Sequence, residues 1–273
     1  MNVSISSPIV VAAQSSTNIG WVGLAISLVL VFITVGVSLW RQLGLERSIL
    51  WASFRALVQL LAVGSILGLL LDTGRPVILA WIWVAFMVCL SAFIVRQRVR
   101  EVPGAGWLAL VAIASSAAMG LGVLFGLGIF PVEGKTVVPL AGMIIGNAMA
   151  SAVVVVRRIV SEVSENRAEI EARLALGQPW QEASRPYLRA ALRTALIPSI
   201  ERTKVVGLVA LPGAMTGLIL AGVAPASAVK IQAAVMFLVL GSEAMTLTVI
   251  ALGLTRRLFT PDHRLRPLAR TLT

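Results

Sequence analysis

The chain has 273 residues, of which 58% are hydrophobic and 13% are charged, and its formal net charge is +11. Soluble proteins carry about 25% charged residues, so this chain has too few charges to cover a water-exposed surface, and a soluble globular fold is excluded. Its basic residues lie between apolar stretches and form no continuous stripe, which excludes nucleic acid as a partner and leaves the lipid bilayer as the solvent.

Seven apolar stretches follow one another along the chain, each of about 20 residues, the length that crosses a ~30 Å hydrocarbon core as a helix. They are residues 19–40, 49–71, 76–95, 107–130, 137–156, 205–223 and 227–254. Helix is expected because backbone groups in lipid must form hydrogen bonds within their own segment, and no stretch alternates like a barrel strand. The sequence therefore predicts an all-α, polytopic membrane helix bundle with about seven transmembrane helices, forming a single transmembrane domain over residues 1–273.

The basic residues between the stretches indicate the orientation of the bundle. All but four of the 23 Lys and Arg residues lie in alternate connections or in the tail after the last stretch, and basic connections favour the cytoplasm. The four exceptions are Arg55, Arg75, Lys135 and Lys230. We therefore expect the N-terminus outside the cell and the C-terminus inside.

The longest polar connection, residues 157–204, is predicted to be an amphipathic segment in the cytoplasm. Glu169 and Arg173 are spaced for an ion pair along a helix, and Gly177 followed by Pro179 ends that helix. Pro186 is expected to begin a second helix.

Polar side chains within the apolar stretches are the candidates for a substrate pathway, because an ionised group at that depth costs several kcal/mol unless it is paired or hydrated. Glu243 lies about 16 Å from the inner end of the last stretch and Arg55 about 9 Å into the second, at 1.5 Å per residue. Gln59 shares the helix face of Arg55, and Asn147 lies in the fifth stretch. Three alternatives stay open: Arg55 extends to the lipid headgroups, Glu243 is protonated and structural, or Asn147 joins two helices by a hydrogen bond.

Glycine residues recur in pairs four positions apart within the stretches, a spacing that lets helices pack closely. The pairs are Gly64 and Gly68, Gly122 and Gly126, Gly142 and Gly146, and Gly213 and Gly217. They predict a tight bundle and are consistent with a homodimer. Pro212 and Gly213 interrupt the sixth stretch, which predicts either a simple kink or a freed carbonyl that lines a cavity.

The chain offers little for catalysis, because acid–base work needs titratable groups brought together and the chain has one His and few acids in its apolar stretches. Residues 134–136 read Gly-Lys-Thr, as in a phosphate-binding loop, but Ile129 occupies the position of the leading glycine. We expect no catalytic residues and no cofactor bound to this chain.

Four segments together resemble the FetB family of ABC-transporter permeases, and the resemblance extends over nearly the whole chain. They are PSIERTKVVGLVALPGAMTGLILAG at 198–222, RALVQL at 55–60, GMIIGNAM at 142–149 and EARLALG at 171–177. The resemblance implies a permease of the cell inner membrane that assembles as a homodimer and works with a separate ABC ATPase subunit, which holds ATP and Mg. Family members are proposed to export iron in bacteria and are linked to aluminium tolerance in plants.

Within the segment 157–204, the resemblance implies contacts with the ATPase. Glu171, Ala172 and Gly177 have the spacing seen in the coupling loops of ABC importers, and Arg173, Arg185 and Arg189 are further coupling candidates in the same segment. The alternative is an ordinary capped amphipathic helix without a docking role.

Iron prefers oxygen and nitrogen ligands, and the apolar stretches provide Glu243, Asn147 and Gln59 but no His. The metal ligands are therefore left unassigned, and the ion is expected to move partly hydrated or chelated, unless the cargo is another solute. The resulting prediction is a permease subunit that exports iron or another metal using a separate ATPase. The alternatives are a stand-alone secondary transporter with Glu243 as a proton or ion site, an intramembrane enzyme, and a scaffold without transport.

Overall fold

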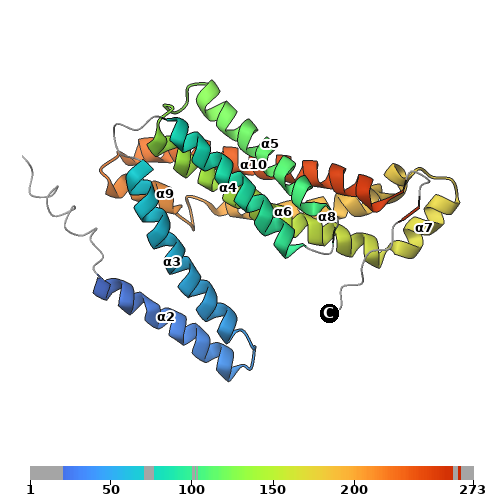
Figure 1. The fold of residues 1–273 in the computed structure, drawn as a ribbon, viewed down its shortest axis with the longest axis horizontal. Helices are drawn as coiled ribbons and strands as arrows, with labels where there is room; N and C mark the ends of the chain where they lie inside the picture. The colour runs from blue at the N-terminus through green and yellow to red at the C-terminus, as the bar shows by residue number, and fades with distance from the viewer. Residues whose placement is uncertain (1–20, 71–76, 100–101, 103, 261–263, 266–273) are drawn as a thin grey trace, which may run out of the picture. The chain divides into compact units, whose positions relative to one another are not determined.

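The computed structural model describes residues 21–70, 77–99, 102, 104–260 and 264–265. These residues form helices α2 to α10 and no named strand, which confirms the predicted all-α fold (Figure 1). The chain divides into two compact units, Met1–Thr73 and Gly74–Thr273, and each is described by itself. The predicted ends of stretches at residues 19, 71 and 76, and Arg75, lie outside the described residues.

The first unit contains two helices, α2 (Trp21–Trp40) and α3 (Glu46–Leu70). Ser38 near the end of α2 is buried and donates a hydrogen bond from Oγ to Glu46 Oε1 at 2.8 Å, while Leu45 N donates to the same Oγ at 3.3 Å. These bonds satisfy polar groups at the start of α3 and hold the turn between the two helices.

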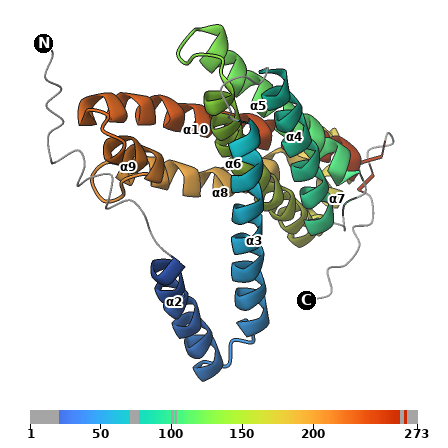
Figure 2. The same ribbon diagram turned by 60° about the vertical axis from the view of Figure 1, so that its left-hand side comes forward.

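The second unit is built around three helices that pack along one another, as Figures 1 and 2 show. Its helices are α4 (Ile78–Arg98), α5 (Ala105–Gly126), α6 (Gly134–Glu165), α7 (Arg167–Ala175), α8 (Trp180–Val205), α9 (Gly213–Leu220) and α10 (Pro225–Leu258). Helices α5, α6 and α10 form the centre, with α4 against α5 and α6, and α8 against α6 and α10. Ser116 on α5 donates a hydrogen bond to the Ser242 carbonyl of α10 at 2.9 Å, which satisfies a buried hydroxyl between two apolar helices.

Within the described residues, five helices are long and apolar enough to cross a membrane: α4, α5, α6, α10 and the part of α3 at Glu46–Ser65. Ala25–Trp40 in α2 is apolar but shorter. The total of seven spans and the orientation of the termini stay predictions.

The predicted sixth span, 205–223, is wrong as a single helix. Its helical part, α9, has eight residues and a length of about 12 Å, which is less than half of a ~30 Å hydrocarbon core. The chain leaves α8 at Val205, and Gly207 then has φ +89°, a left-handed conformation that ends a helix. Pro212 precedes α9 and lacks the N–H that a continuous helix would need.

The three glycine pairs of the second unit do not bring helices of that unit together, so the predicted close packing at these pairs is not found there; a role in a homodimer stays a prediction. In the pairs Gly122 and Gly126, and Gly213 and Gly217, a Cβ built on either glycine would meet no atom of the described residues within 4 Å. In the pair Gly142 and Gly146, only a Cβ on Gly142 would meet one, Met87 Cε at 3.4 Å. The close approaches occur at unpaired glycines: a Cβ on Gly253 of α10 would lie 2.2 Å from Leu108 Cδ1 of α5. Local packing, and not the four-residue spacing, therefore decides where small residues are needed.

The Gly-Lys-Thr sequence begins α6. Glu133 is the N-cap residue, and its backbone N–H donates to Thr136 Oγ1 at 3.3 Å. Lys135 pairs with the Glu133 carboxylate at 2.8 Å. The three residues thus form the start of a helix in place of a strand-to-helix phosphate loop.

Candidate functional site

Glu243 lies near the middle of α10, about 22 Å from the C-terminal end of this helix and about 27 Å from its N-terminal end. Its side chain is 1% exposed. The carboxyl group is therefore buried inside the second unit. Burying an unpaired carboxylate is costly, so its partners decide what it can do.

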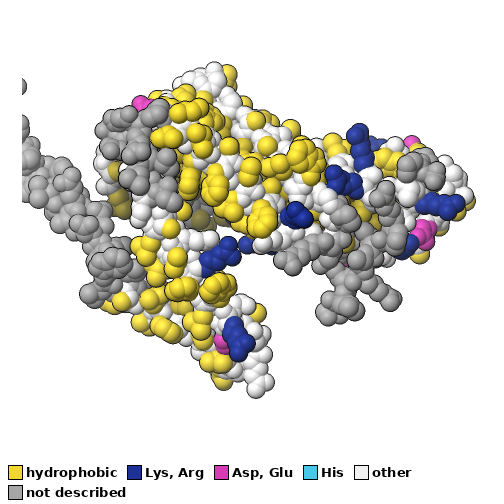
Figure 3. Space-filling view, in the orientation of Figure 1, with side chains coloured by type: hydrophobic (Ala, Val, Ile, Leu, Met, Phe, Trp, Pro, Cys, Tyr) yellow, Lys and Arg dark blue, Asp and Glu magenta, His cyan; other side chains and the backbone are white. Residues whose placement is uncertain are grey.

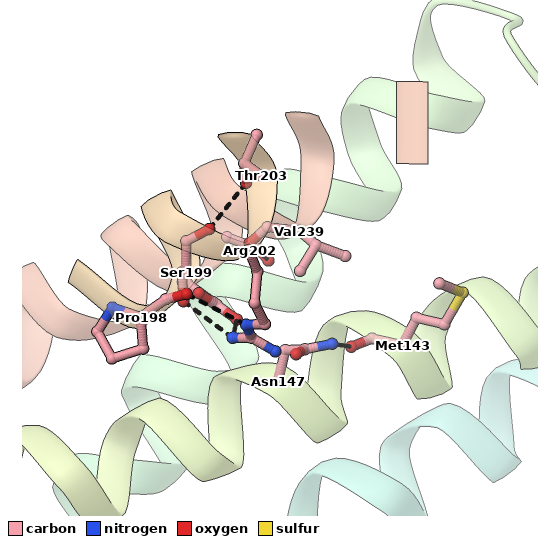
Figure 4. Close-up of polar contacts among 9 residues, drawn as sticks. Met143, Asn147, Pro198, Ser199, Arg202, Thr203 and Val239 are labelled. Carbon is pink, nitrogen blue, oxygen red and sulfur yellow. Dashed lines mark hydrogen bonds and ion pairs between the residues drawn. The ribbon is translucent and has the colours of Figure 1, made fainter. Parts of the chain in front are cut away.

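The partner of Glu243 is Arg202, a residue that was not predicted to line the pathway. Arg202 Nη2 lies 3.4 Å from Glu243 Oε1, longer than the 2.7 to 2.9 Å that is typical of a strong charge-assisted bond. The same Nη2 donates to Ser199 Oγ at 3.0 Å, one turn earlier on α8 (Figure 4). The arginine is thus shared between its own helix and the acid of α10.

These residues line a pocket of about 210 Å³ between α6, α8 and α10. Two buried oxygens in its lining, Gln232 Oε1 and Glu243 Oε2, accept no hydrogen bond from the described residues. Buried polar atoms are nearly always satisfied in folded proteins. Two unsatisfied oxygens in one small pocket therefore indicate a place where a ligand, an ion or water completes the bonding.

Asn147 of α6 lines the same pocket as Glu243, so the structure brings two of the predicted pathway residues together. Figure 4 shows Asn147 with Ser199 and Arg202, two other residues of the lining. Its Nδ2 donates to the Met143 carbonyl of its own helix at 2.8 Å. The predicted alternative, a hydrogen bond from Asn147 to another helix, is not formed within the described residues. Its amide oxygen accepts no hydrogen bond from them either, and it is a third potential ligand oxygen.

The break between α8 and α9 borders this pocket, since Val206 and Pro212 both belong to the lining. Gly207 N–H donates to the Ala210 carbonyl at 3.0 Å, which satisfies part of the non-helical backbone. Irregular backbone at membrane depth is tolerated where it lines a cavity, and interrupted helices form the binding sites of many transporters. The helix is therefore broken beside the pocket and not simply kinked, and the freed carbonyl stays a prediction.

Arg55 and Gln59 lie one turn apart on α3, in the first unit, and both side chains are exposed. Their role in the pathway stays a prediction.

Arg202 and Gln232 are the pocket residues that sequence reasoning missed. Arg202 was assigned to the cytoplasmic segment 157–204, but the second half of α8 packs against α6 and α10. The available signal was the helical pattern of 180–205, which continues through Ser199 to Arg202 without a break. Gln232 had a weaker signal, a single amide in the apolar first half of α10.

The predicted coupling residues fall into two groups. Glu171, Ala172 and Arg173 lie on α7, and Gly177, with φ +86°, forms the turn to α8. Arg185 and Arg189 lie on α8 and line a different pocket, between α8 and α10. The structure therefore places the six residues at two sites.

Helix α7 is attached to α8 by a cluster of three side chains. Arg173 Nη2 donates to Glu169 Oε1 at 2.7 Å, and this bond holds the pKa of the Glu169 carboxyl below its usual range. Burial raises the pKa of the Tyr187 hydroxyl, and its hydrogen bond to Glu169 raises that pKa further. Arg173 Cζ also lies 6.0 Å from the centre of the Tyr187 ring. Ile170 of the same helix is fully buried, whereas most other residues of α7 are exposed, so α7 is fixed on one face and open on the other.

The open end of α7 presents an apolar side chain, since Leu176 at the turn is 83% exposed. Glu171 is held by Arg167, whose Nε lies 2.8 Å from Glu171 Oε1. Figure 3 shows that, on the face of the second unit turned to the viewer, Lys and Arg side chains gather toward the end that holds α7. The surface around Leu176 therefore combines charged side chains with one exposed leucine.

Residues 21–259 match the family described as "Uncharacterised protein family (UPF0014)". The chain is 34% identical over 253 residues, 92% of its own length and 97% of the relative's, to "Probable iron export permease protein FetB" of Escherichia coli (strain K12). It is 36% identical over 218 residues, 79% of its length and 75% of the relative's, to "UPF0014 membrane protein STAR2" of Oryza sativa subsp. japonica.

"Protein ALUMINUM SENSITIVE 3" of Arabidopsis thaliana is 31% identical over 229 residues, which cover 83% of each chain. These matches confirm the resemblance to the FetB-type and plant proteins. No solved structure matches the chain.

Proposed function

The chain belongs to the UPF0014 family of multi-pass membrane proteins, and from this premise we propose that it is the permease subunit of an ABC transporter that exports a metal cation. Iron is the first candidate, because the Escherichia coli relative is named as an iron export permease. A separate ATPase subunit hydrolyses ATP and drives the export.

The observation that carries this proposal is the pair of unpartnered oxygens, Glu243 Oε2 and Gln232 Oε1, in one pocket at mid-helix depth. Carboxylate and amide oxygens are ligands that hard cations accept. An intramembrane acid is costly to keep without a partner, so it is retained where it handles charge. The pocket is therefore suited to a positively charged cargo.

Arg202 neutralises Glu243 when no cargo is bound. Its bond to Glu243 is long at 3.4 Å, and 64% of its side chain is exposed, so it has room to withdraw. A cation that enters the pocket replaces the guanidinium at the carboxylate and keeps the buried charge balanced. The break between α8 and α9 lies beside Arg202 and allows this end of α8 to move.

The pocket holds its cargo weakly, as a transport pathway requires. Among the described residues, no three His, Cys, Asp or Glu side chains lie close enough to hold a metal ion. One carboxylate with two amide oxygens replaces only part of a hydration shell. A partly hydrated or chelated ion is the form of cargo that this set of ligands suits.

The ATPase docks on α7 and its turn, around Glu171, Ala172, Arg173 and Gly177. Leu176, 83% exposed at this turn, is the apolar contact that inserts into the ATPase. Two permease copies assemble with two ATPase subunits, and glycines such as Gly122 and Gly126, open within this chain, are available to the second copy.

The test is to purify the chain with the ATPase subunit expressed beside it, reconstitute the complex in proteoliposomes and measure ATP hydrolysis with Fe²⁺, with Al³⁺ and without metal. We expect the two subunits to purify together and Fe²⁺ to stimulate hydrolysis. Transport by the chain alone, driven by a proton gradient, would favour a secondary transporter instead. If another solute stimulates hydrolysis and iron does not, the cargo assignment is overturned.

The docking surface has its own test. Leu176→Asp should abolish co-purification of the ATPase, because it places a charge in the apolar contact. Ala168→Asp is the matched control: Ala168 is exposed in the first turn of α7, where an acidic residue is favourable, and this variant should retain the ATPase. Equal retention by both variants would place the docking surface elsewhere.

A further inference from the structure

A second pocket, of about 470 Å³, lies between the first half of α8 and the last part of α10. The two helices are antiparallel, since Trp180 of α8 stacks on Phe259 after α10 at 5.6 Å and Arg202 contacts Glu243. One end of the pocket therefore lies at the C-terminal end of α10, and the other extends toward the middle of that helix. The proposed cargo pathway does not use this pocket.

Three arginines line the pocket: Arg185 and Arg189 from α8, and Arg256 from α10. None of the three forms an ion pair or hydrogen bond with a described residue. Glu182 is the one acidic residue among the described lining residues. The lining thus carries two positive charges in excess, and an anionic ligand complements it.

The remainder of the lining is mostly apolar and lies deeper along α10. Leu252 is about 6 Å along α10 from Arg256, and Thr248 about 12 Å, in the direction of the helix middle. Leu188 and Leu192 of α8 face them across the pocket. The pocket thus has its charged side chains at the end of α10 and its apolar side chains toward the middle of that helix. A phospholipid has the same arrangement, with its charged headgroup at the membrane interface and its acyl chains in the hydrocarbon core.

We propose that this pocket binds one anionic phospholipid. The arginines hold the headgroup phosphate, and the leucines contact the first part of an acyl chain. A water-soluble ATPase fits this pocket less well, because the leucine wall extends into the depth of a membrane-spanning helix. A lipid seated here contacts both α8 and α10, the two helices that hold Arg202 and Glu243, and so stabilises their packing.

The experiment uses the full chain, purified in mild detergent and stripped of lipid, with phosphatidylglycerol, phosphatidylcholine and inorganic phosphate as probes. Binding is measured by native mass spectrometry and by the shift in melting temperature. Phosphatidylglycerol should bind and stabilise the chain, phosphatidylcholine should bind much more weakly, and inorganic phosphate should not displace the lipid. Displacement by phosphate at modest concentration would make this a site for a free anion and overturn the proposal.

The matched variants remove the same charge at different places. Arg185→Gln with Arg189→Gln should weaken phosphatidylglycerol binding by about 30-fold, given the typical contribution of a basic side chain near an anionic lipid surface. Arg158→Gln with Arg193→Gln removes two exposed arginines outside the pocket lining and should leave binding unchanged. Arg256→Gln, on α10 at the opposite wall, should weaken phosphatidylglycerol binding as well. The result then does not depend on variants of α8 alone.

If Arg185 and Arg189 instead dock the ATPase, the same variant gives a different result in a test of lipid binding and ATPase co-purification. If the Arg185→Gln, Arg189→Gln variant binds phosphatidylglycerol like the original chain but loses the ATPase, the two arginines belong to the docking surface and the lipid site is refuted. Loss of lipid binding with the ATPase retained supports the lipid site.

Discussion

Arg202 and Glu243 form an ion pair in which the two members are very differently placed. The glutamate is 1% exposed and the arginine is 64% exposed, with 3.4 Å between Nη2 and Oε1. The buried Glu243 carboxylate thus depends on Arg202 to balance its charge, while Arg202 also donates a hydrogen bond to Ser199 Oγ. This asymmetry predicts that the two residues respond differently to substitution.

Arg202→Gln should destabilise the chain more than Glu243→Gln. Removing the arginine leaves a buried carboxylate without its partner, which we expect to cost about 3 kcal/mol. Removing the acid leaves an exposed guanidinium, and we expect a cost below about 1 kcal/mol. Thermal unfolding in detergent measures both. The double variant, which removes both charges, should regain most of the stability lost in Arg202→Gln, and equal losses in the two single variants would contradict the assigned burial.

Gln232→Leu should separate stability from transport. Gln232 Oε1 is buried and accepts no hydrogen bond from the described residues, so its removal should leave the melting temperature unchanged or raise it. Metal export should fall, because the pocket loses a ligand oxygen. The measurement is export in proteoliposomes together with thermal unfolding of the same preparation. A variant that exports normally would show that Gln232 is no part of the pathway.

The break between α8 and α9 depends on Gly207, whose φ is +89°. A Cβ there meets no atom of the described residues within 4 Å, so Gly207→Ala acts through backbone strain alone and should cost about 1 to 2 kcal/mol. Gly217→Ala is the control, and its effect on stability should be the opposite. Gly217 lies inside α9, and a Cβ there also meets no atom of the described residues within 4 Å, so alanine should stabilise the helix by up to about 1 kcal/mol. Stabilisation by both substitutions would mean that 205–223 is one continuous helix.

Tyr187 offers a pH measurement that needs no probe, because it is the only tyrosine of the chain. Burial raises its pKa first, and the hydrogen bond to Glu169 raises it further, so tyrosinate should form at higher pH than in a free peptide. Glu169→Gln should lower this pKa toward its ordinary value while the effect of burial remains. Arg173→Gln should raise it, because the arginine favours the phenolate. Ultraviolet absorbance during a pH titration measures the Tyr187 pKa in the original chain and in both variants. The same pKa in all three proteins would show that α7 is not attached to α8 at this cluster.

The apolar stretches were sufficient to predict most of the membrane helices, because length and hydrophobicity follow from the lipid solvent. Helices α4, α5, α6 and α10 all contain the stretch predicted for them or most of it. The stretch 205–223 failed because hydrophobicity alone does not detect a conformational break. Gly207 and Pro212 act on the backbone, and they end a helix inside a segment that is apolar throughout.

The candidate site was predicted in part. Depth identified Glu243 and Asn147, since both lie in apolar stretches, and the structure places them in one pocket. The partner Arg202 was missed because a local pattern assigns it to a polar segment, whereas packing of α8 against α6 and α10 places its guanidinium beside Glu243. The helical pattern of 180–205 extends the helix to Arg202, but contacts between distant parts of the chain decide which residue Arg202 pairs with.

The central claim is that Glu243 binds the exported cation. The most direct measurement is ATP-driven accumulation of Fe²⁺ in inside-out vesicles that contain the permease with its ATPase. We expect accumulation with the original chain and with Glu201→Gln, which removes an exposed acid paired to Lys204 on α8, and none with Glu243→Gln although the ATPase still assembles. Accumulation by Glu243→Gln at the rate of the original chain would contradict the account.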